Sequence, residues 1–153
     1  KKFHLPNPEQ CVKCSNFIGQ TLDKACELGF QRILLVGHIG KLVKLGAGIM
    51  NTHSKMADAR MEILACCVLL SGGDAALAKQ ILSCTVTEEA LQILWENAQM
   101  PNVMEVLMGR IEKHLLHRLA GQAKIGVIVF SNIYGVLGKT RDAEELLEIV
   151  RGE

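Results

Sequence analysis

The chain has 153 residues, of which 49% are hydrophobic and 22% charged, and its formal net charge is +1. This length fits one domain with a substantial core. The small net charge argues against a general nucleic-acid binder, and no apolar run reaches the roughly 18 residues of a membrane span. With no basic signal-peptide start, these features predict a single soluble domain over residues 1–153, located in the cytoplasm.

Strand-like and helix-like segments alternate along the chain. A weak strand is predicted at residues 11–14, and stronger ones at 32–36 and 124–130. The two stronger segments are continuous apolar runs with β-branched residues, which are typical of buried parallel strands. Because helical patterns separate the strands, right-handed crossovers are expected between them. The predicted fold class is therefore α/β: a small parallel sheet with helices on both faces, in a Rossmann-like three-layer arrangement.

The first helix is predicted to start at Ser15 or Asn16, either of which can cap it, and to end at Gly29. Further helices are predicted at residues 57–71, 74–82, 85–98, 103–119 and 143–150. Thr85 with Glu88 fits a capping box at the start of the helix at 85–98. The helix at 57–71 carries charges only in its first turns and is apolar beyond them, so it should be central and buried. Cys66 and Cys67 lie inside it and should belong to the core.

The segment that follows the strand at 32–36 is too long and chemically mixed for a plain connection. Residues 38–60 hold four basic residues, Lys41, Lys44, Lys55 and Arg60, against Asp58 alone, so an anionic ligand would be attracted there. Lys41 and Lys44 are three residues apart and would share a helix face near Gly37 and Gly40. This favours an anion site at a helix start, although a solvated helix face is the alternative.

Two histidines in this segment are candidate catalytic residues. His38 directly follows the strand, and His53 lies in a polar turn beside Asn51 and Thr52. Imidazole can act as a base near neutral pH, which suits either residue to proton abstraction. Asp58 and Arg60 head the predicted helix at 57–71, where charges usually have a partner or a ligand. Capping by Ser54 and a simple ion pair form the alternative account.

A sequence echo links the ends of the predicted strands. Ser15-Asn16 follows the segment at 11–14, and Ser131-Asn132 follows the one at 124–130, each pair succeeded by two apolar residues and a glycine. Ligands in open α/β sheets bind outside the carboxyl ends of the strands. Both Ser-Asn turns and the turn at residues 37–40 are therefore expected to meet at one edge. The alternative is that they are ordinary helix caps and tight turns.

Two further motifs carry little functional weight. Cys11 and Cys14 form a CxxC pair, but no second CxxC and no histidine pair at zinc-finger spacing accompanies it, so packing is preferred over a metal or redox role. Lys139-Thr140 imitates the end of a phosphate-binding loop. Its preceding glycines, Gly135 and Gly138, are too close together for that motif, so nucleotide hydrolysis is not expected.

Four stretches carry a resemblance to a known family: SNFIGQTLDKACELG from Ser15, ILLVGHIGKLVKL from Ile33, GIMNTHSKMADARMEIL from Gly48 and VIVFSNIYGVLGKT from Val127. Together they resemble the CbiD-type family, the cobalt-precorrin-5B methyltransferases of anaerobic cobalamin synthesis. The resemblance implies transfer of a methyl group from S-adenosylmethionine to carbon one of a cobalt-containing tetrapyrrole. The substrate carries carboxylates that the basic residues match in sign, and no protein metal site is required, since cobalt arrives inside the substrate.

Two departures from the family pattern limit the prediction. Members are longer and have an N-terminal domain, so the chain resembles an excised C-terminal domain that can be inactive without that partner. The turn at residues 37–40 is not the glycine loop of common Rossmann-type methyltransferases, so no motif locates the methyl donor. A different class stays open: an anion- or nucleotide-binding module without catalytic activity. Neither nucleic acid nor membrane is expected as a partner.

The hypothesis for the site is as follows. The candidate catalytic residues are His53, His38 and Asp58. The candidate substrate- or donor-binding residues are Ser15, Asn16, Gly37, Gly40, Lys41, Lys44, Asn51, Thr52, Lys55, Arg60, Ser131 and Asn132.

Overall fold

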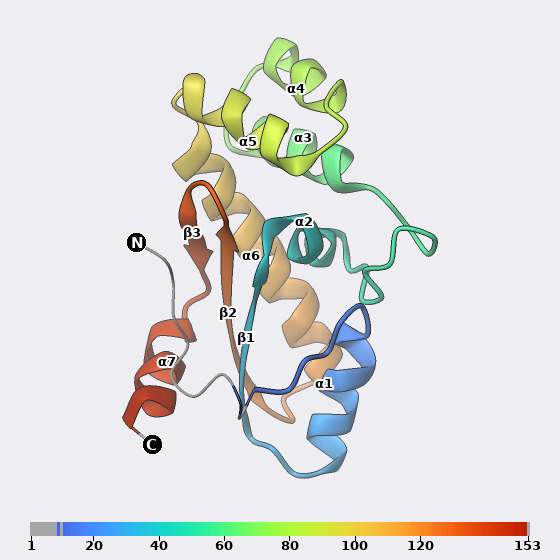
Figure 1. The fold of residues 1–153 in the computed structure, drawn as a ribbon, viewed down its shortest axis with the longest axis vertical. Coiled ribbons are helices and arrows are strands. Elements are labelled where there is room, and N and C mark those ends of the chain that lie inside the picture. Colours follow the sequence, from blue (N-terminus) through green and yellow to red (C-terminus); the bar gives the residue numbers. More distant parts are fainter. Residues whose placement is uncertain (1–8, 10, 153) are drawn as a thin grey trace.

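The computed structural model describes residues 9 and 11–152, and Figure 1 shows how their helices and strands are arranged. The elements are, in chain order, α1 (Ile18–Glu27), β1 (Arg32–His38), α2 (Ile39–Leu42), the 3-10 helix η2 (Val43–Ala47), α3 (Arg60–Leu70), α4 (Ala75–Leu82), α5 (Thr87–Glu96), α6 (Met100–Leu119), β2 (Lys124–Ser131), β3 (Gly135–Lys139) and α7 (Ala143–Gly152). In the part of the chain that is described, no helix is both long and apolar enough to cross a bilayer.

The sheet has three strands in the order β1-β2-β3. β1 and β2 are parallel, with Arg32 opposite Lys124 and His38 opposite Phe130, as the sequence predicts. β3 runs antiparallel to β2, so the expectation of a purely parallel sheet is wrong. The cause is a hairpin after β2: Gly135 adopts φ 72°, a left-handed conformation that glycine accepts without a steric penalty. A Rossmann-like arrangement is not established by this mixed sheet.

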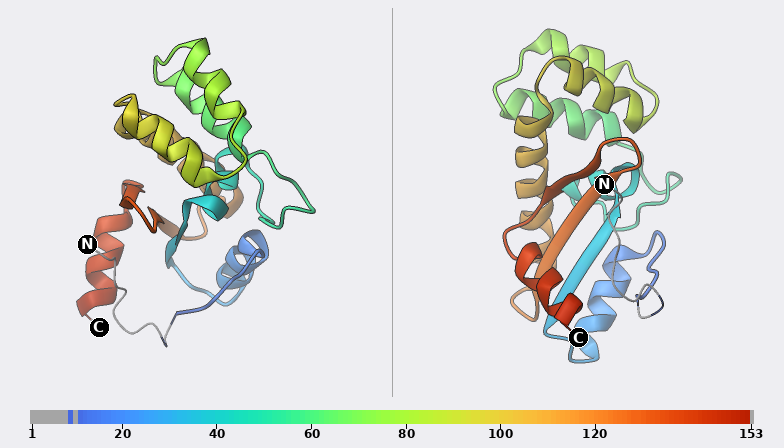
Figure 2. Two further views of the ribbon diagram at one scale, coloured as in Figure 1. Left: turned by 45° about the horizontal axis from the view of Figure 1, so that its top comes forward. Right: turned by 60° about the vertical axis from the view of Figure 1, so that its left-hand side comes forward.

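Side chains alternate between the two faces of the sheet. Ile33, Leu35 and Val127 point into the main core, whereas Leu34, Val36 and Ile128 pack with Ala143 and Leu147 of α7. Helices therefore cover both faces, as predicted, and Figure 2 shows α7 on one side with α1 and α6 on the other. Gly126 permits this contact, because a Cβ atom there would lie 2.6 Å from the Cα atom of Ala143.

α6 is the longest of the described helices and contacts both the sheet and most of the other helices. Its predicted apolar stripe is confirmed, since Val103, Leu107, Ile111, Leu115 and Leu119 are all buried. The helices α3, α4 and α5 gather around the first half of α6, beyond the carboxyl ends of β1 and β2 (Figures 1 and 2). This group of three helices faces the sheet edge at which the sequence predicts a site.

Several local predictions are wrong. Residues 11–14 form no strand; nearby, Phe17 makes only an isolated bridge to Asn51. The cap residue of α1 is Phe17, without a side-chain hydrogen bond, in place of Ser15 or Asn16. In α5, the amide of Thr85 donates to Glu89, where the sequence suggested a capping box with Glu88.

The helix predicted at 57–71 also differs in its start and in its burial. α3 begins at Arg60 with Ala59 as its cap residue, so Ser54 does not cap it. Cys67 is buried, but the adjacent Cys66 is exposed, contrary to prediction. Leu70 is 59% exposed, so α3 has one free side. Its uniform apolar composition could not indicate which side this would be.

Candidate functional site

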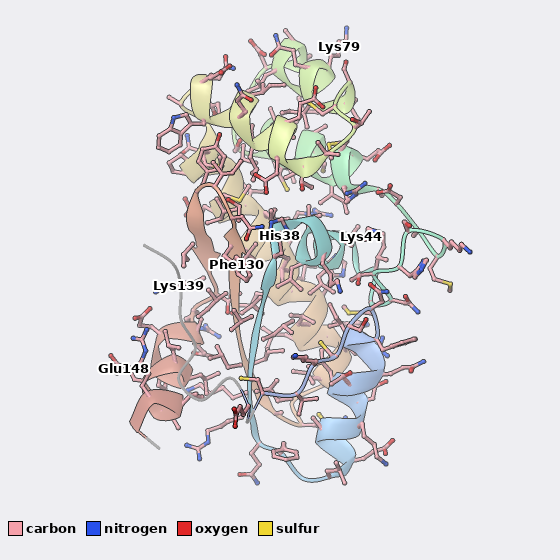
Figure 3. The ribbon with its side chains drawn as sticks, viewed as in Figure 1. His38, Lys44, Lys79, Phe130, Lys139 and Glu148 are labelled. Carbon is pink, nitrogen blue, oxygen red and sulfur yellow. The ribbon has the colours of Figure 1, made fainter. Side chains whose placement is uncertain are left out.

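The carboxyl ends of β1 and β2 bring predicted site residues to one edge of the sheet. His38 and Ser131 end the two parallel strands and emerge together there, as predicted. The rings of His38 and Phe130 meet edge to face, with centroids 5.7 Å apart (Figure 3). We call this region the strand-end site.

His38 is held by two hydrogen-bonding groups of the protein. Its Nδ1 accepts from the amide of Gly40 at 3.0 Å and so caps α2. Its Nε2 lies 3.3 Å from Oε1 of Glu88 in α5. A neutral imidazole that accepts at Nδ1 carries its proton on Nε2, where it can donate to this carboxylate. The lone pair that a catalytic base would use is therefore occupied in this arrangement.

Glu88 belongs to the strand-end site although the sequence suggested only a capping role for it. Its side chain is 32% exposed, yet its Oε2 atom is buried without a hydrogen-bond partner among the described residues. Buried polar atoms normally have such a partner, so this oxygen can accept from a further donor. No sequence signal could have found the residue, because its contact with His38 joins distant parts of the chain.

The other predicted residues at this edge shape the backbone. Ser131 is buried, and its Oγ accepts from the amide of Tyr134 at 2.8 Å, which fixes the turn into β3. Asn132 in the same turn is exposed. Gly37 lies so close to Leu42 that a Cβ atom would approach its Cγ atom at 2.8 Å. The close approach of Leu42 therefore explains why position 37 is a glycine, without any role in ligand binding.

The first Ser-Asn turn does not join the strand-end site, so the expectation that three turns meet there is wrong. Asn16 instead pairs with Thr52: its carbonyl accepts from the Thr52 amide at 3.0 Å, and its Oδ1 accepts from the Thr52 hydroxyl at 3.1 Å. Ser15 precedes this pair and adopts φ 49°. The physical reason is that no strand forms at residues 11–14 to deliver this turn to the sheet edge.

Lys44 is buried, contrary to both the solvated-face and the surface anion-site interpretations. Its side chain reaches into the loop at residues 49–59, where Nζ donates to the carbonyl oxygens of Thr52 at 2.9 Å and Ala57 at 2.8 Å. The residue is only 2% exposed. The ammonium group of Lys44 therefore holds the loop in place through these two hydrogen bonds. Of the two lysines, only Lys41, which is half-buried, stays a candidate for contact with a ligand.

The same loop presents His53 in a network of local hydrogen bonds. Oδ1 of Asn51 accepts from the His53 amide at 3.1 Å, and Nδ1 of His53 accepts from the Lys55 amide at 3.0 Å. His53 and Lys55 are exposed, so both remain accessible. As with His38, a role for His53 as base requires release of the bond that occupies its Nδ1.

Asp58 and Arg60 form a bidentate ion pair at the start of α3. Nε of Arg60 lies 2.9 Å from Oδ1 of Asp58, and Nη2 lies 3.2 Å from Oδ2. The hydrogen bond from Arg60 lowers the pKa of Asp58 from its ordinary value, and Asp58 raises that of Arg60. Asp58 is therefore ionised at neutral pH and cannot serve as a proton donor there.

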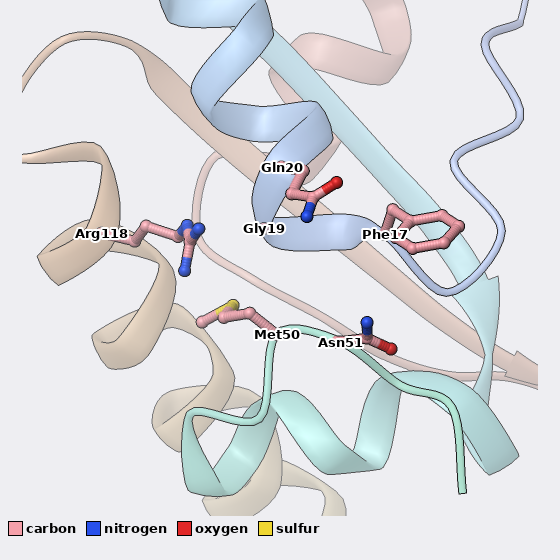
Figure 4. A pocket seen from close by; sticks show the side chains of 6 residues that line it. All are labelled: Phe17, Gly19, Gln20, Met50, Asn51 and Arg118. Atoms are coloured by element: carbon pink, nitrogen blue, oxygen red, sulfur yellow. The ribbon is translucent and has the colours of Figure 1, made fainter. Parts of the chain in front are cut away.

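A cavity of about 200 Å³ lies beside this loop, between α1, the loop and α6 (Figure 4). Asn51 lines it, as do Phe17, Gln20 and Arg118. Arg118 also binds Asp23 through two hydrogen bonds of 3.0 and 2.8 Å. Sequence reasoning missed Arg118, since the pair with Asp23 spans 95 positions.

Among the described residues, no group of three or more histidine, cysteine or acidic side chains could hold a metal ion. Cys11 is exposed, and Cys14 packs against the main core. The residues that could act chemically thus fall into two regions, the strand-end site and the loop at 49–59.

Comparison with known proteins shows similarity to a single family. A family model described as the C-terminal domain of CbiD matches residues 51–141. Relatives named cobalt-precorrin-5B C(1)-methyltransferase include that of Alkaliphilus metalliredigens, 39% identical over 99% of this chain and 39% of its own length. The relative of Clostridioides difficile is 38% identical over 90% of this chain and 34% of its own length. That of Methanocaldococcus jannaschii is 41% identical over 90% and 38%, respectively.

The chain therefore spans between about a third and two fifths of the length of the curated relatives that it matches. No solved structure shows a significant match to it.

Proposed function

The chain belongs to the CbiD family, and from this premise we propose that it forms part of a cobalt-precorrin-5B C(1)-methyltransferase of cobalamin biosynthesis. The observation that carries the proposal is similarity over 99% of the chain to a relative of that name. The methyl acceptor would be carbon one of the cobalt-containing tetrapyrrole, and the donor S-adenosylmethionine. We place the enzyme in the cytoplasm.

Binding of the acceptor would rest on the basic residues near the loop at 49–59. Lys41, Lys55 and Arg60 each present a charged group that is exposed or half-buried, and Asn51 and Asn132 offer amide groups. The tetrapyrrole carries several carboxylates, which the ammonium groups of the lysines would bind as point charges. Arg60 would bind a carboxylate bidentately only on releasing Asp58. The residues of this chain would thereby orient the ring, and such positioning supplies much of the acceleration in group transfer.

The donor, when bound, supplies a methyl group attached to a sulfonium ion, which becomes a neutral thioether when the ring carbon takes the methyl group. What remains for the protein is to hold the reactants in line, exclude water and accept any proton that the ring system releases. His53 is the candidate for the last task because it carries an imidazole and is exposed beside the basic residues. The released Nδ1 would be the accepting atom.

A chimeric enzyme tests this function. Residues of this chain replace the matched segment of the Alkaliphilus metalliredigens relative, which supplies the remaining three fifths of a full-length enzyme. Incubation with cobalt-precorrin-5B and S-adenosylmethionine should increase the mass of the tetrapyrrole by one methyl group. The parent enzyme without this segment is the control and should be inactive. A folded chimera that leaves the tetrapyrrole unmethylated would refute the proposal.

A further inference from the structure

Three aromatic side chains gather where α5 meets the turn between β2 and β3. The chain has one tryptophan, one tyrosine and four phenylalanines, so these three are half of its aromatic residues. The rings of Trp95 in α5 and Tyr134 in the turn have centroids 5.5 Å apart. Phe130, near the end of β2, contacts His38. Figures 1 and 2 show this turn beside α5.

Much of this region is exposed to solvent. Trp95 is 63% exposed, Ile133 beside Tyr134 is 70% exposed, and Val136 in β3 is 39% exposed. Val136 lies opposite Phe130 in the antiparallel strand pair, so these two side chains share one face of the sheet. We call Trp95, Ile133, Tyr134 and Val136 the hairpin patch. Tryptophan is highly buried on average, and exposed apolar side chains that cluster mark interaction sites, whereas single ones do not.

The backbone that carries the hairpin patch is held in place by the protein itself. Oγ of the buried Ser131 accepts from the amide of Tyr134 at 2.8 Å, and Gly135 ends the turn with φ 72°. Trp95 belongs to the last turn of α5. Tyrosine and tryptophan have only two side-chain torsions, so their ordering on binding costs little conformational entropy. The hairpin patch therefore presents its aromatic rings in a fixed place before any partner binds.

Polar groups of the strand-end site border the hairpin patch. Glu88, Gln92 and Trp95 are spaced four and three residues apart, so they share one face of α5. At one end of this face Glu88 meets His38, and the two side chains are 32% and 33% exposed. At the other end Trp95 meets Tyr134. An apolar centre with a polar rim is the usual anatomy of a protein interface, and tryptophan and tyrosine are enriched among the residues that dominate binding.

The size of the hairpin patch indicates what kind of partner covers it. Its four side chains are far fewer than the roughly 20–30 residues a side of a stable interface between separate molecules, which argues against a second copy. Two parts of one polypeptide can associate through a smaller and more polar contact, because their linkage gives a high effective concentration. The relative of Alkaliphilus metalliredigens has such a further part, since this chain covers only 39% of its length.

We propose that the hairpin patch binds the part of the full-length enzyme that lies outside the segment matched by this chain. Apolar side chains of that part would pack on Trp95 and Ile133, and its polar groups would meet the rim at His38 and Glu88. The contact would hold that part of the enzyme directly beside the strand-end site. The proposal rests on membership of the CbiD family and on the exposed patch, and does not depend on methyl transfer.

Hydroxyl-radical footprinting with peptide mass spectrometry tests the proposal by comparing the isolated chain with the chimeric enzyme, once thermal unfolding has shown that both are folded. Trp95 should be oxidised about fivefold or more slowly in the chimera, because the core of an interface excludes water. Phe30 is the matched internal control. It is 57% exposed and precedes β1, at the opposite end of that strand from His38, so its oxidation should not change. Equal oxidation of Trp95 in the chain and the chimera would overturn the proposal.

Two variants supply a second readout. Trp95→Ser should reduce the difference in Tyr134 oxidation between the chain and the chimera, whereas Phe30→Ser should leave that difference unchanged. Sedimentation velocity of the isolated chain tests the other occupant: a dimer that Trp95→Ser dissociates would assign the patch to a second copy and overturn the proposal. Protection of Trp95 in a chimera that transfers no methyl group would refute only the proposed function, and turnover with Trp95 unprotected would refute only the interface.

Discussion

Nε2 of His38 at the end of β1 and Oε1 of Glu88 in the first turn of α5 lie 3.3 Å apart. This contact ties the carboxyl edge of the sheet to the group of helices α3, α4 and α5. The same imidazole caps α2 through Gly40, so one side chain orders two junctions. In this structure His38 is a positioning residue of the strand-end site. Its use as a base at Nδ1 would break the hydrogen bond from the Gly40 amide.

His38→Ala should reduce the free energy of unfolding by about 1–2 kcal/mol, because α2 loses its capping side chain and the Glu88 carboxylate loses the donor at His38 Nε2. His38→Asn should recover part of this, since asparagine is a good capping residue. Urea unfolding measures both. Wild-type stability in His38→Ala would show that neither contact contributes, and Glu148→Gln on the exposed side of α7 controls for a neutral surface change.

Lys44→Met should destabilise the chain by about 1–3 kcal/mol, because it leaves the carbonyl oxygens of Thr52 and Ala57 without their donor. Lys41→Met is the matched control and should change stability by less than about 0.5 kcal/mol. Hydrogen exchange should locate the effect of Lys44→Met in the loop at residues 49–59. Equal effects of the two substitutions would contradict the structural role of Lys44.

His53→Ala should keep wild-type stability, because the side chain is exposed and makes one local bond. In the chimeric enzyme it should slow methyl transfer by roughly 10²-fold or more if the imidazole accepts a proton. Steady-state kinetics and thermal unfolding of the same sample decide the matter. Unchanged turnover would leave this turn with a structural role alone.

The pKa of the Asp58 carboxyl should lie below its ordinary value, chiefly because Arg60 donates hydrogen bonds to it. A depressed folded-state pKa stabilises the fold above the unfolded-state value, and this contribution is lost as the pH falls through the folded-state value. Because the Asp58 side chain is exposed to solvent, the stabilisation should be small. Carboxyl chemical shifts followed from pH 2 to pH 6 measure the pKa, and Arg60→Met should raise it; an unchanged value would exclude the ion pair in solution.

Cys66 and Cys67 should differ sharply in reactivity despite being neighbours. Burial raises the pKa of the Cys67 thiol to about 11, whereas Cys66 is exposed. At pH 8 only about one Cys67 thiol in a thousand would be ionised, and a buried thiol is also inaccessible to reagents. Iodoacetamide labelling followed by peptide mass spectrometry should therefore modify Cys66 first. Faster labelling of Cys67 would mean that α3 is rotated about its axis.

Elements whose evidence is local were predictable from the sequence. The apolar runs that became β1 and β2 and the stripe of α6 from Val103 to Leu119 were predictable because periodicity reports which side chains leave water. Parallel pairing of β1 with β2 followed from the helices between them. That His38 and Ser131 lie at the same edge of the sheet followed from the parallel direction of these two strands alone.

The partners of the polar residues could not be predicted, because they come from distant parts of the chain. Lys44 reads as a surface lysine because a local pattern contains no record of the two carbonyl oxygens, 8 and 13 positions away, that permit its burial. The prediction that Asn16 lies at the sheet edge was wrong for the same reason, since its hydrogen bond with Thr52 spans 36 positions. β3 was missed because a short segment with two glycines forms a strand only when β2 offers its edge.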